Sequence, residues 1–179
     1  MVWRPKAVHR PQDEQEIAEI VNRVIEDGDR LKPVGSGLSW SDINEVEDEH
    51  LLRLDRMASI DVQAESKRVR VQGGAVMSDI QKALEEQNLV LDNIGSIVTQ
   101  TAAGYTGTGT HGSGTPLLST FIEELQLVDG TGRIRTLSPS QEPELFSAAR
   151  SDAAIYTLSV RHGDQWTMMS PAESIGKMW

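Results

Sequence analysis

Residues 93–114, which read NIGSIVTQTAAGYTGTGTHGSG, carry the residue types that could hold a ligand against the backbone. Six glycines and seven serines or threonines fall in this stretch. Glycine accepts positive φ and lets backbone N–H groups converge on an anion, while hydroxyl groups add rotatable donors. Because the intervening side chains are mostly small, the backbone can approach a flat or phosphorylated molecule. The stretch therefore predicts a cradle for a cofactor.

A surface loop of turn-forming residues is the alternative for the same stretch. Solvent-exposed loops rarely contain many apolar side chains, yet several apolar residues lie between the polar residues of this stretch. They are Ile94, Ile97, Val98, Ala102, Ala103 and Tyr105. This apolar content favours the cradle.

A second small-residue loop, Gly35-Ser36-Gly37-Leu38-Ser39-Trp40, follows a strand predicted at residues 31–34. Phosphate-binding loops occur directly after strands, but a lone Gly-x-Gly is also typical of ordinary turns. From these residues alone, both interpretations stay open.

Composition excludes several classes of function. The net charge of −10 argues against a nucleic-acid surface, so local N–H groups must hold any anionic ligand. The chain has no cysteine, and its four histidines lack metal-ligand spacing, so no metal site is predicted. No apolar run approaches the roughly 18 residues of a membrane helix, and the N-terminus does not resemble a signal peptide. We expect a cytoplasmic protein without a transmembrane segment or a nucleic-acid partner.

The elements that must position these loops follow from periodicity. An apolar stripe at Ile17, Ile20, Val21, Val24 and Ile25 predicts a helix. Asp13 with Glu16 matches a capping pattern at its start, and Gly28 suits its end.

The remaining elements are shorter. Strands are predicted at 31–34, 51–54, 59–62, 67–72, 121–128, 134–137 and 155–160, and further helices at 78–87 and 141–150. The Asp129-Gly130 pair predicts a hairpin, Ser140 a helix cap, and Leu145, Phe146 and Ala149 an inward face. The acidic segment 42–49 is interpreted as a solvated connection, and residues 161–179 have no assignment. We expect one domain over 1–179, with one lobe at about 7–62 and another at about 66–160.

Eight segments in this order resemble a known family. They are RPQDEQEIAEIV, PVGSGLSWSDI, LLRLDRM, VRVQGGAVMSDIQKAL, LDNIGSI, GYTGTGTHGSG, LQLVDGTGRI and PELFSAAR, spread over about residues 10–150. The chain resembles the FAD-binding domain of the vanillyl-alcohol oxidase superfamily, the p-cresol methylhydroxylase (PCMH) type. Within it the likeness is to alditol oxidase and the sugar-1,4-lactone oxidases, which act on aldonolactones, L-gulonolactone or D-arabinono-1,4-lactone. The resemblance implies an α+β fold, with a small N-terminal α/β lobe, a larger C-terminal α+β lobe, and FAD between them.

The resemblance also implies which residues bind FAD. The pyrophosphate would be held by Val34, Gly35, Ser36, Gly37, Leu38 and Ser39. The pyrophosphate and isoalloxazine would be lined by Ser96, Thr101, Gly104, Thr108, Gly109, Thr110 and His111, and the adenine by the backbone of Ile155. For His111, a cofactor contact and a purely structural hydrogen-bonding role both stay open. No residue is predicted to be catalytic.

Two positions differ among relatives. Many relatives have a flavin-linking histidine where this chain has Leu38, so we expect non-covalent FAD. In lactone dehydrogenases that avoid oxygen, the position that matches Gly95 looks like alanine. By this resemblance, glycine here implies a path for oxygen beside the flavin. The glycines that relatives carry in the loop after Arg150 are missing, which implies weaker contacts on the adenine side.

By resemblance, the complete enzyme moves a hydride from a C–H bond of a sugar lactone or polyol to flavin N5 and then passes electrons to oxygen. The family's substrate domain and its C-terminal His-Trp-Gly-Lys type motif have no counterpart in these residues. Two alternatives stay open. One is a stand-alone FAD-binding subunit whose open flavin face is covered by a partner chain or by self-association; the other is a degenerate remnant without activity.

Overall fold

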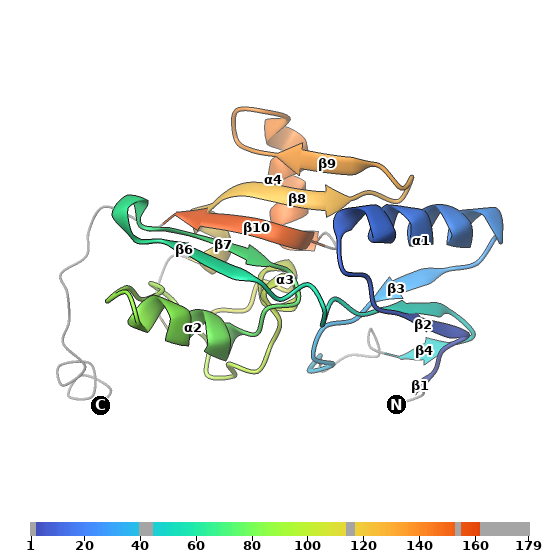
Figure 1. The fold of residues 1–179 in the computed structure, drawn as a ribbon, viewed down its shortest axis with the longest axis horizontal. Coiled ribbons are helices and arrows are strands. Elements are labelled where there is room, and N and C mark those ends of the chain that lie inside the picture. The colour runs from blue at the N-terminus through green and yellow to red at the C-terminus, as the bar shows by residue number, and fades with distance from the viewer. Residues whose placement is uncertain (1–2, 40–44, 114–116, 153–154, 162–179) are drawn as a thin grey trace.

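The computed structural model describes residues 3–39, 45–113, 117–152 and 155–161. Trp40 and the unassigned tail after residue 161 lie outside the described residues. Figure 1 shows short parallel strands at one end of the molecule and a longer antiparallel sheet at the other. Across the described parts of the chain, none of the helices combines the length and apolar character that a membrane crossing requires.

The N-terminal part is built on short parallel strands. Its elements are β1 (Trp3–Arg4), β2 (Ala7–His9), α1 (Glu14–Glu26), β3 (Leu31–Pro33), β4 (Val46–Glu47) and β5 (His50–Leu52). β5 lies between β2 and β3 in a three-stranded parallel sheet, and β1 pairs with β4. The sequence patterns did not predict β1, β2 or β4, because strands of two or three residues are too short to show a period.

Helix α1 confirms the predicted stripe and cap. Asp13 is the N-cap, and its Oδ1 accepts a hydrogen bond of 2.8 Å from the Glu16 N–H. Gly28 follows the helix with φ of +68°, a conformation that suits glycine. Ile17 and Val24 are buried, whereas Ile25 at the edge of the stripe is 51% exposed.

The C-terminal part is one antiparallel sheet with the strand order β6-β7-β10-β8-β9. Its strands are β6 (Ile60–Gln63), β7 (Arg68–Gln72), β8 (Ile122–Val128), β9 (Ile134–Leu137) and β10 (Ile155–Arg161). The helices here are α2 (Met77–Glu85), α3 (Ala102–Gly107) and α4 (Pro143–Asp152), with 3-10 turns η2 (Ala64–Ser66) and η3 (Leu118–Phe121). Side chains from this sheet and its helices, joined by Ile17 of α1 and Leu52 of β5, supply most of the main apolar core.

The predicted hairpin is confirmed, since β8 pairs with β9 across a loop at 129–133 that the Asp129 N–H to Arg133 O bond closes. Two other local predictions were wrong. Ser140 does not cap α4, because the first helical bond runs from Phe146 N–H to Glu142 O. Leu145 is 40% exposed, and the buried face consists of Phe146 and Ala149.

The change from one sheet to the other falls between Leu52 and Ile60, since β6 pairs with β7. Strand pairing therefore favours a lobe boundary somewhat earlier than the sequence suggests. The lobe limits themselves stay a proposal.

Candidate functional site

A cleft of about 610 Å³ separates the two parts of the described chain. Ligand sites typically hold roughly 300–1,000 Å³. Its lining comes from α1 and from residues within 29–36, 52–55, 73–76, 101–108 and 128–130. Both small-residue loops contribute, although they are far apart in the sequence. By contrast, the cavity beside Leu84 and Phe121 holds about 20 Å³, room for about one water.

One wall of the cleft is the carboxyl edge of the parallel sheet. Because β2, β3 and β5 run parallel, the residues that follow them emerge at the same edge. Gly35 and Ser36 follow β3, and Arg53 and Asp55 follow β5. Arg10 follows β2 and forms an ion pair of 3.1 Å with Asp55. This edge of the sheet therefore carries both polar side chains and the first small-residue loop.

The two small-residue loops are joined directly. The Ser36 hydroxyl donates a hydrogen bond of 2.6 Å to the Thr99 carbonyl. A methyl group on Gly35 would lie 2.4 Å from Thr101 Oγ1, so a side chain there would push the loops apart. At Gly74, on the neighbouring turn, a methyl group would lie 1.8 Å from the Leu54 carbonyl oxygen. The backbone segments around the cleft thus pack closer than larger residues permit.

The predicted cradle is not one continuous loop, because α3 lies inside it. Thr101 is the N-cap of this short helix and accepts a bond of 3.3 Å from the Gly104 N–H. Glycines at 104 and 107 obscured the helix in the sequence, since glycine is a poor helix former. The ends of the stretch are tied together where Asn93 Oδ1 accepts a 2.7 Å bond from the Gly112 N–H.

Tyr105 organises the part of the cradle that follows α3. It is fully buried, and its hydroxyl accepts a bond of 2.7 Å from the Gly95 N–H. Burial raises the pKa of the Tyr105 hydroxyl above its ordinary value, and the Gly95 bond opposes that rise. A methyl group on Gly95 would lie 3.2 Å from Thr110 Cγ2 and 3.3 Å from the His111 carbonyl oxygen. Gly95, Thr110 and His111 are therefore neighbours, as a common site requires.

The predicted site residues fall into two groups. Those that line the cleft are Val34, Gly35, Ser36, Thr101, Gly104 and Thr108. Those that lie outside its lining are Gly37, Leu38, Ser39, Gly95, Ser96, Gly109, Thr110, His111 and Ile155.

Within the second group, the geometry differs from residue to residue. Gly37 and Gly109 have positive φ of 72° and 61°. Leu38 is 43% exposed, and the ring of His111 is exposed with its Nδ1 2.7 Å from the Gly112 carbonyl oxygen. Ile155 pairs with Leu127 in the sheet.

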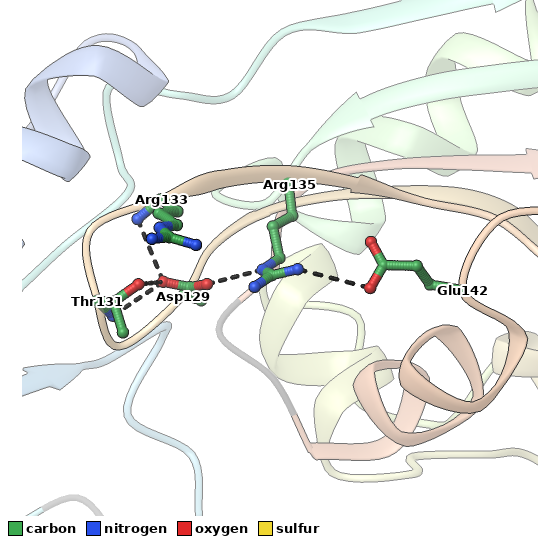
Figure 2. A network of polar contacts seen from close by, with 5 residues as sticks. All are labelled: Asp129, Thr131, Arg133, Arg135 and Glu142. Carbon is green, nitrogen blue, oxygen red and sulfur yellow. Dashed lines mark hydrogen bonds and ion pairs between the residues drawn. The ribbon is translucent and has the colours of Figure 1, made fainter.

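The charged residues of the cleft are three aspartates and one arginine, namely Asp29, Asp55, Asp129 and Arg53. Asp29 contacts Lys6 and His50, and Asp55 pairs with Arg10. Asp129 accepts bonds from the Thr131 hydroxyl at 2.6 Å and from Arg135 Nε at 2.7 Å, as Figure 2 shows. The Thr131 hydroxyl and the Arg135 guanidinium hold the pKa of Asp129 well below its ordinary range. Each aspartate is thus already compensated by the protein.

Arg53 differs from these aspartates. It is half-buried, and its Nε is buried without a hydrogen-bond partner. Sequence reasoning missed Arg53, Asp55, Gly74 and the Asp129 loop as cleft residues. The parallel pairing of β3 with β5 could have indicated Arg53, but that pairing leaves no local signal in the sequence.

A cleft of this size, with glycine-bearing loops at the carboxyl edge of parallel strands, defines a nucleotide-cofactor domain. The chain belongs to the FAD binding domain family, whose model matches residues 5–138. The predicted FAD-binding domain and its cofactor are therefore confirmed.

Known proteins extend this comparison. D-arabinono-1,4-lactone oxidase of Kluyveromyces lactis is 35% identical over 153 residues, which cover 82% of this chain and 29% of that protein. L-gulonolactone oxidase of Bos taurus is 32% identical over 150 residues, which cover 82% of this chain and 34% of that protein. The chain thus spans about a third of the length of these relatives.

A solved structure confirms the fold. The crystal structure of 6-hydroxy-D-nicotine oxidase from Arthrobacter nicotinovorans matches with a TM-score of 0.82 at 24% identity, covering 90% of this chain and 37% of that one. The α+β fold predicted from the sequence is confirmed.

The cleft residues fit FAD. The cleft is large enough for a dinucleotide, and the small residues Gly35 and Ser36 of the first loop line it. Arg53 offers a cation whose Nε has no partner in the protein. FAD carries a diphosphate, which both backbone N–H groups and a guanidinium group can bind.

Proposed function

We propose that this chain is the FAD-binding part of a flavin-dependent oxidoreductase that acts on a sugar lactone or polyol. The observation that carries the proposal is the joining of the two small-residue loops across the cleft, through Ser36 and Thr99, in a chain of the FAD binding domain family. The relatives named as lactone oxidases support the substrate class. In this proposal, the substrate contacts of the complete enzyme lie in a region that corresponds to the part of those relatives that this chain does not span.

The residues of the cleft take separate roles in this proposal. The backbone of residues 34–39 binds the diphosphate, and Gly37 within this loop has a φ of +72°. Thr101, Gly104 and Thr108 line the other side, where Thr108 Oγ1 donates 2.8 Å to the Gly104 carbonyl. When bound, FAD would supply the isoalloxazine ring as the acceptor of a hydride.

Gly95 and Leu38 set the chemical character of the site. Leu38 has no nucleophilic atom, which supports non-covalent FAD. At Gly95 a methyl group would lie 3.2 Å from Thr110 Cγ2 and 3.3 Å from the His111 carbonyl oxygen, closer than ordinary contacts, so glycine suits this packed position. We propose that oxygen reaches the flavin there, and that the enzyme is an oxidase. A cytoplasmic location is proposed as well, in line with the expectation from the sequence.

The test is a visible absorption spectrum of the purified chain after incubation with FAD and desalting, followed by acid precipitation. The proposal predicts flavin absorbance in the desalted protein and release of all flavin into the acid supernatant. Colourless, folded protein would contradict FAD binding, and would favour a remnant without activity. Flavin that stays in the acid pellet would contradict the non-covalent assignment alone.

A further inference from the structure

The charge balance of the cleft leaves one side chain without a role. Asp29, Asp55 and Asp129 each have a cationic partner within the protein. Among the described residues that line the cleft, Arg53 is the single cation. Its Nε is buried and has no hydrogen-bond partner, which costs free energy.

The position of Arg53 places it beside the diphosphate loop. Leu52 pairs with Pro33 in the parallel sheet, so the residues that follow them, Arg53 and Val34, leave neighbouring strands at the same edge. The Val34 N–H donates 2.9 Å to the Leu52 carbonyl, and the Arg53 N–H donates 2.9 Å to the His9 carbonyl. These bonds fix the backbone at both places, so the guanidinium is presented from a rigid strand end.

A diphosphate in this cleft needs more than backbone donors. The chain carries a net charge of −10, and three aspartates line the same cleft. Guanidinium groups bind phosphate oxygens through parallel N–H bonds and keep their charge at all working pH values. We propose that Arg53 binds the diphosphate of FAD and provides the cationic side chain that the cleft otherwise lacks. This assignment rests on the proposed function, because it requires FAD in this cleft.

The test compares the affinities of four proteins for FAD and for ADP, which carries the same diphosphate without the flavin. The variants are Arg53→Met, Arg53→Lys and, as a matched control, Arg56→Gln. Methionine keeps the buried stem and removes the unpartnered Nε, so the fold should be retained, as a thermal melt checks. Arg56 is exposed and does not line the cleft.

FAD binding is followed by flavin fluorescence, and ADP binding by competition with FAD. Loss of a charge-assisted bond predicts that Arg53→Met weakens both ligands by about 10- to 100-fold. Arg53→Lys should recover part of that loss, since it keeps the charge without the fork. Arg56→Gln should stay within about twofold of wild type, as expected for an exposed charge.

Three outcomes would overturn the assignment. Arg53→Met could bind both ligands as wild type does, or weaken FAD but not ADP, or lose no more affinity than Arg56→Gln. If Arg53→Met fails to fold, the test uses Arg53→Lys instead. Wild-type affinity of Arg53→Lys for FAD at both high and low salt would contradict a forked contact between Arg53 and the diphosphate. A wild-type chain that binds neither FAD nor ADP would contradict the proposed function itself.

Discussion

The two parts of the molecule differ in how they are held together. The antiparallel sheet carries the main apolar core, with Leu125 and Leu137 fully buried. In the parallel part, Val34, Val46 and Leu51 form a separate small cluster, whereas Leu52 of β5 packs in the main core. Yet the loops after β3 and β5 form one wall of the cleft. The comparison indicates that the large core supplies stability, while the small parallel sheet mainly positions binding groups.

The largest effect is expected at the glycines of the two small-residue loops. Gly37→Val and Gly109→Val should each abolish FAD retention, because a β-branched residue is strained at their φ of 72° and 61°. Gly28→Val is the matched control, with a φ of 68° beyond the end of α1 and open space around it. It should lose stability but keep FAD in a desalting assay. Yellow Gly37→Val protein would count against the loop assignment.

The next effect separates the two cores. Leu125→Ala in the antiparallel sheet should lower the free energy of unfolding by about 2–5 kcal/mol, because it leaves a cavity at a fully buried position. Val46→Ala should cost roughly 1.5–2 kcal/mol, as it removes fewer methyl groups. Urea denaturation measures both. Equal losses per carbon atom removed at the two sites would argue against a division of stability between the two parts.

A smaller loss is expected where the hydroxyl of Tyr105 is removed. Tyr105→Phe leaves the buried Gly95 N–H without its 2.7 Å acceptor, which should cost about 1–3 kcal/mol. Thr136→Val is the control, since its exposed hydroxyl makes only a 3.4 Å contact with Gln126. Thermal melts compare the two variants. A Tyr105→Phe protein as stable as Thr136→Val would show that Gly95 is satisfied in another way.

The smallest effect concerns pH and is confined to the parallel sheet. His9 Nε2 lies 2.8 Å from His50 Nδ1, and His50 Nε2 lies 3.2 Å from Asp29 Oδ2. Burial, and then the charge of His50 and of Arg23, lowers the pKa of His9 below its ordinary value of 6.5. His9 therefore binds a proton more readily in the unfolded chain than in the folded one. The stability that neutral His9 contributes to the fold is present above about pH 6.5 and is lost as the pH falls.

Other charges around His9 bear on the same measurement. Lys6 contacts Asp29, and that hydrogen bond lowers the pKa of Asp29, whose own effect on stability falls at more acidic pH. His9→Gln should flatten the fall in melting temperature between about pH 7 and 5. An unchanged pH profile in this variant would remove His9 from the explanation.

Local patterns predicted some of this structure well. The stripe and cap of α1 depend on residues within three or four positions, and α1 formed as expected. Long-range pairing left no such trace, so neither the central place of β10 nor the position of β5 between β2 and β3 could be predicted. Glycines masked α3, and Arg53 became a cleft residue only through the pairing of β5 with β3. The two small-residue loops could be predicted, because close approach of backbone segments requires glycine and the glycine content can be read directly from the sequence.

The most direct measurement is hydrogen–deuterium exchange of the intact chain with and without saturating FAD. If FAD binds in the cleft, backbone amides of residues 34–39 and 101–109 should gain protection together, because both loops face the cofactor. Helix α2, which does not line the cleft, serves as the internal control and should exchange at the same rate in both samples. Protection confined to other segments, with both loops unchanged, would contradict the location of the cofactor.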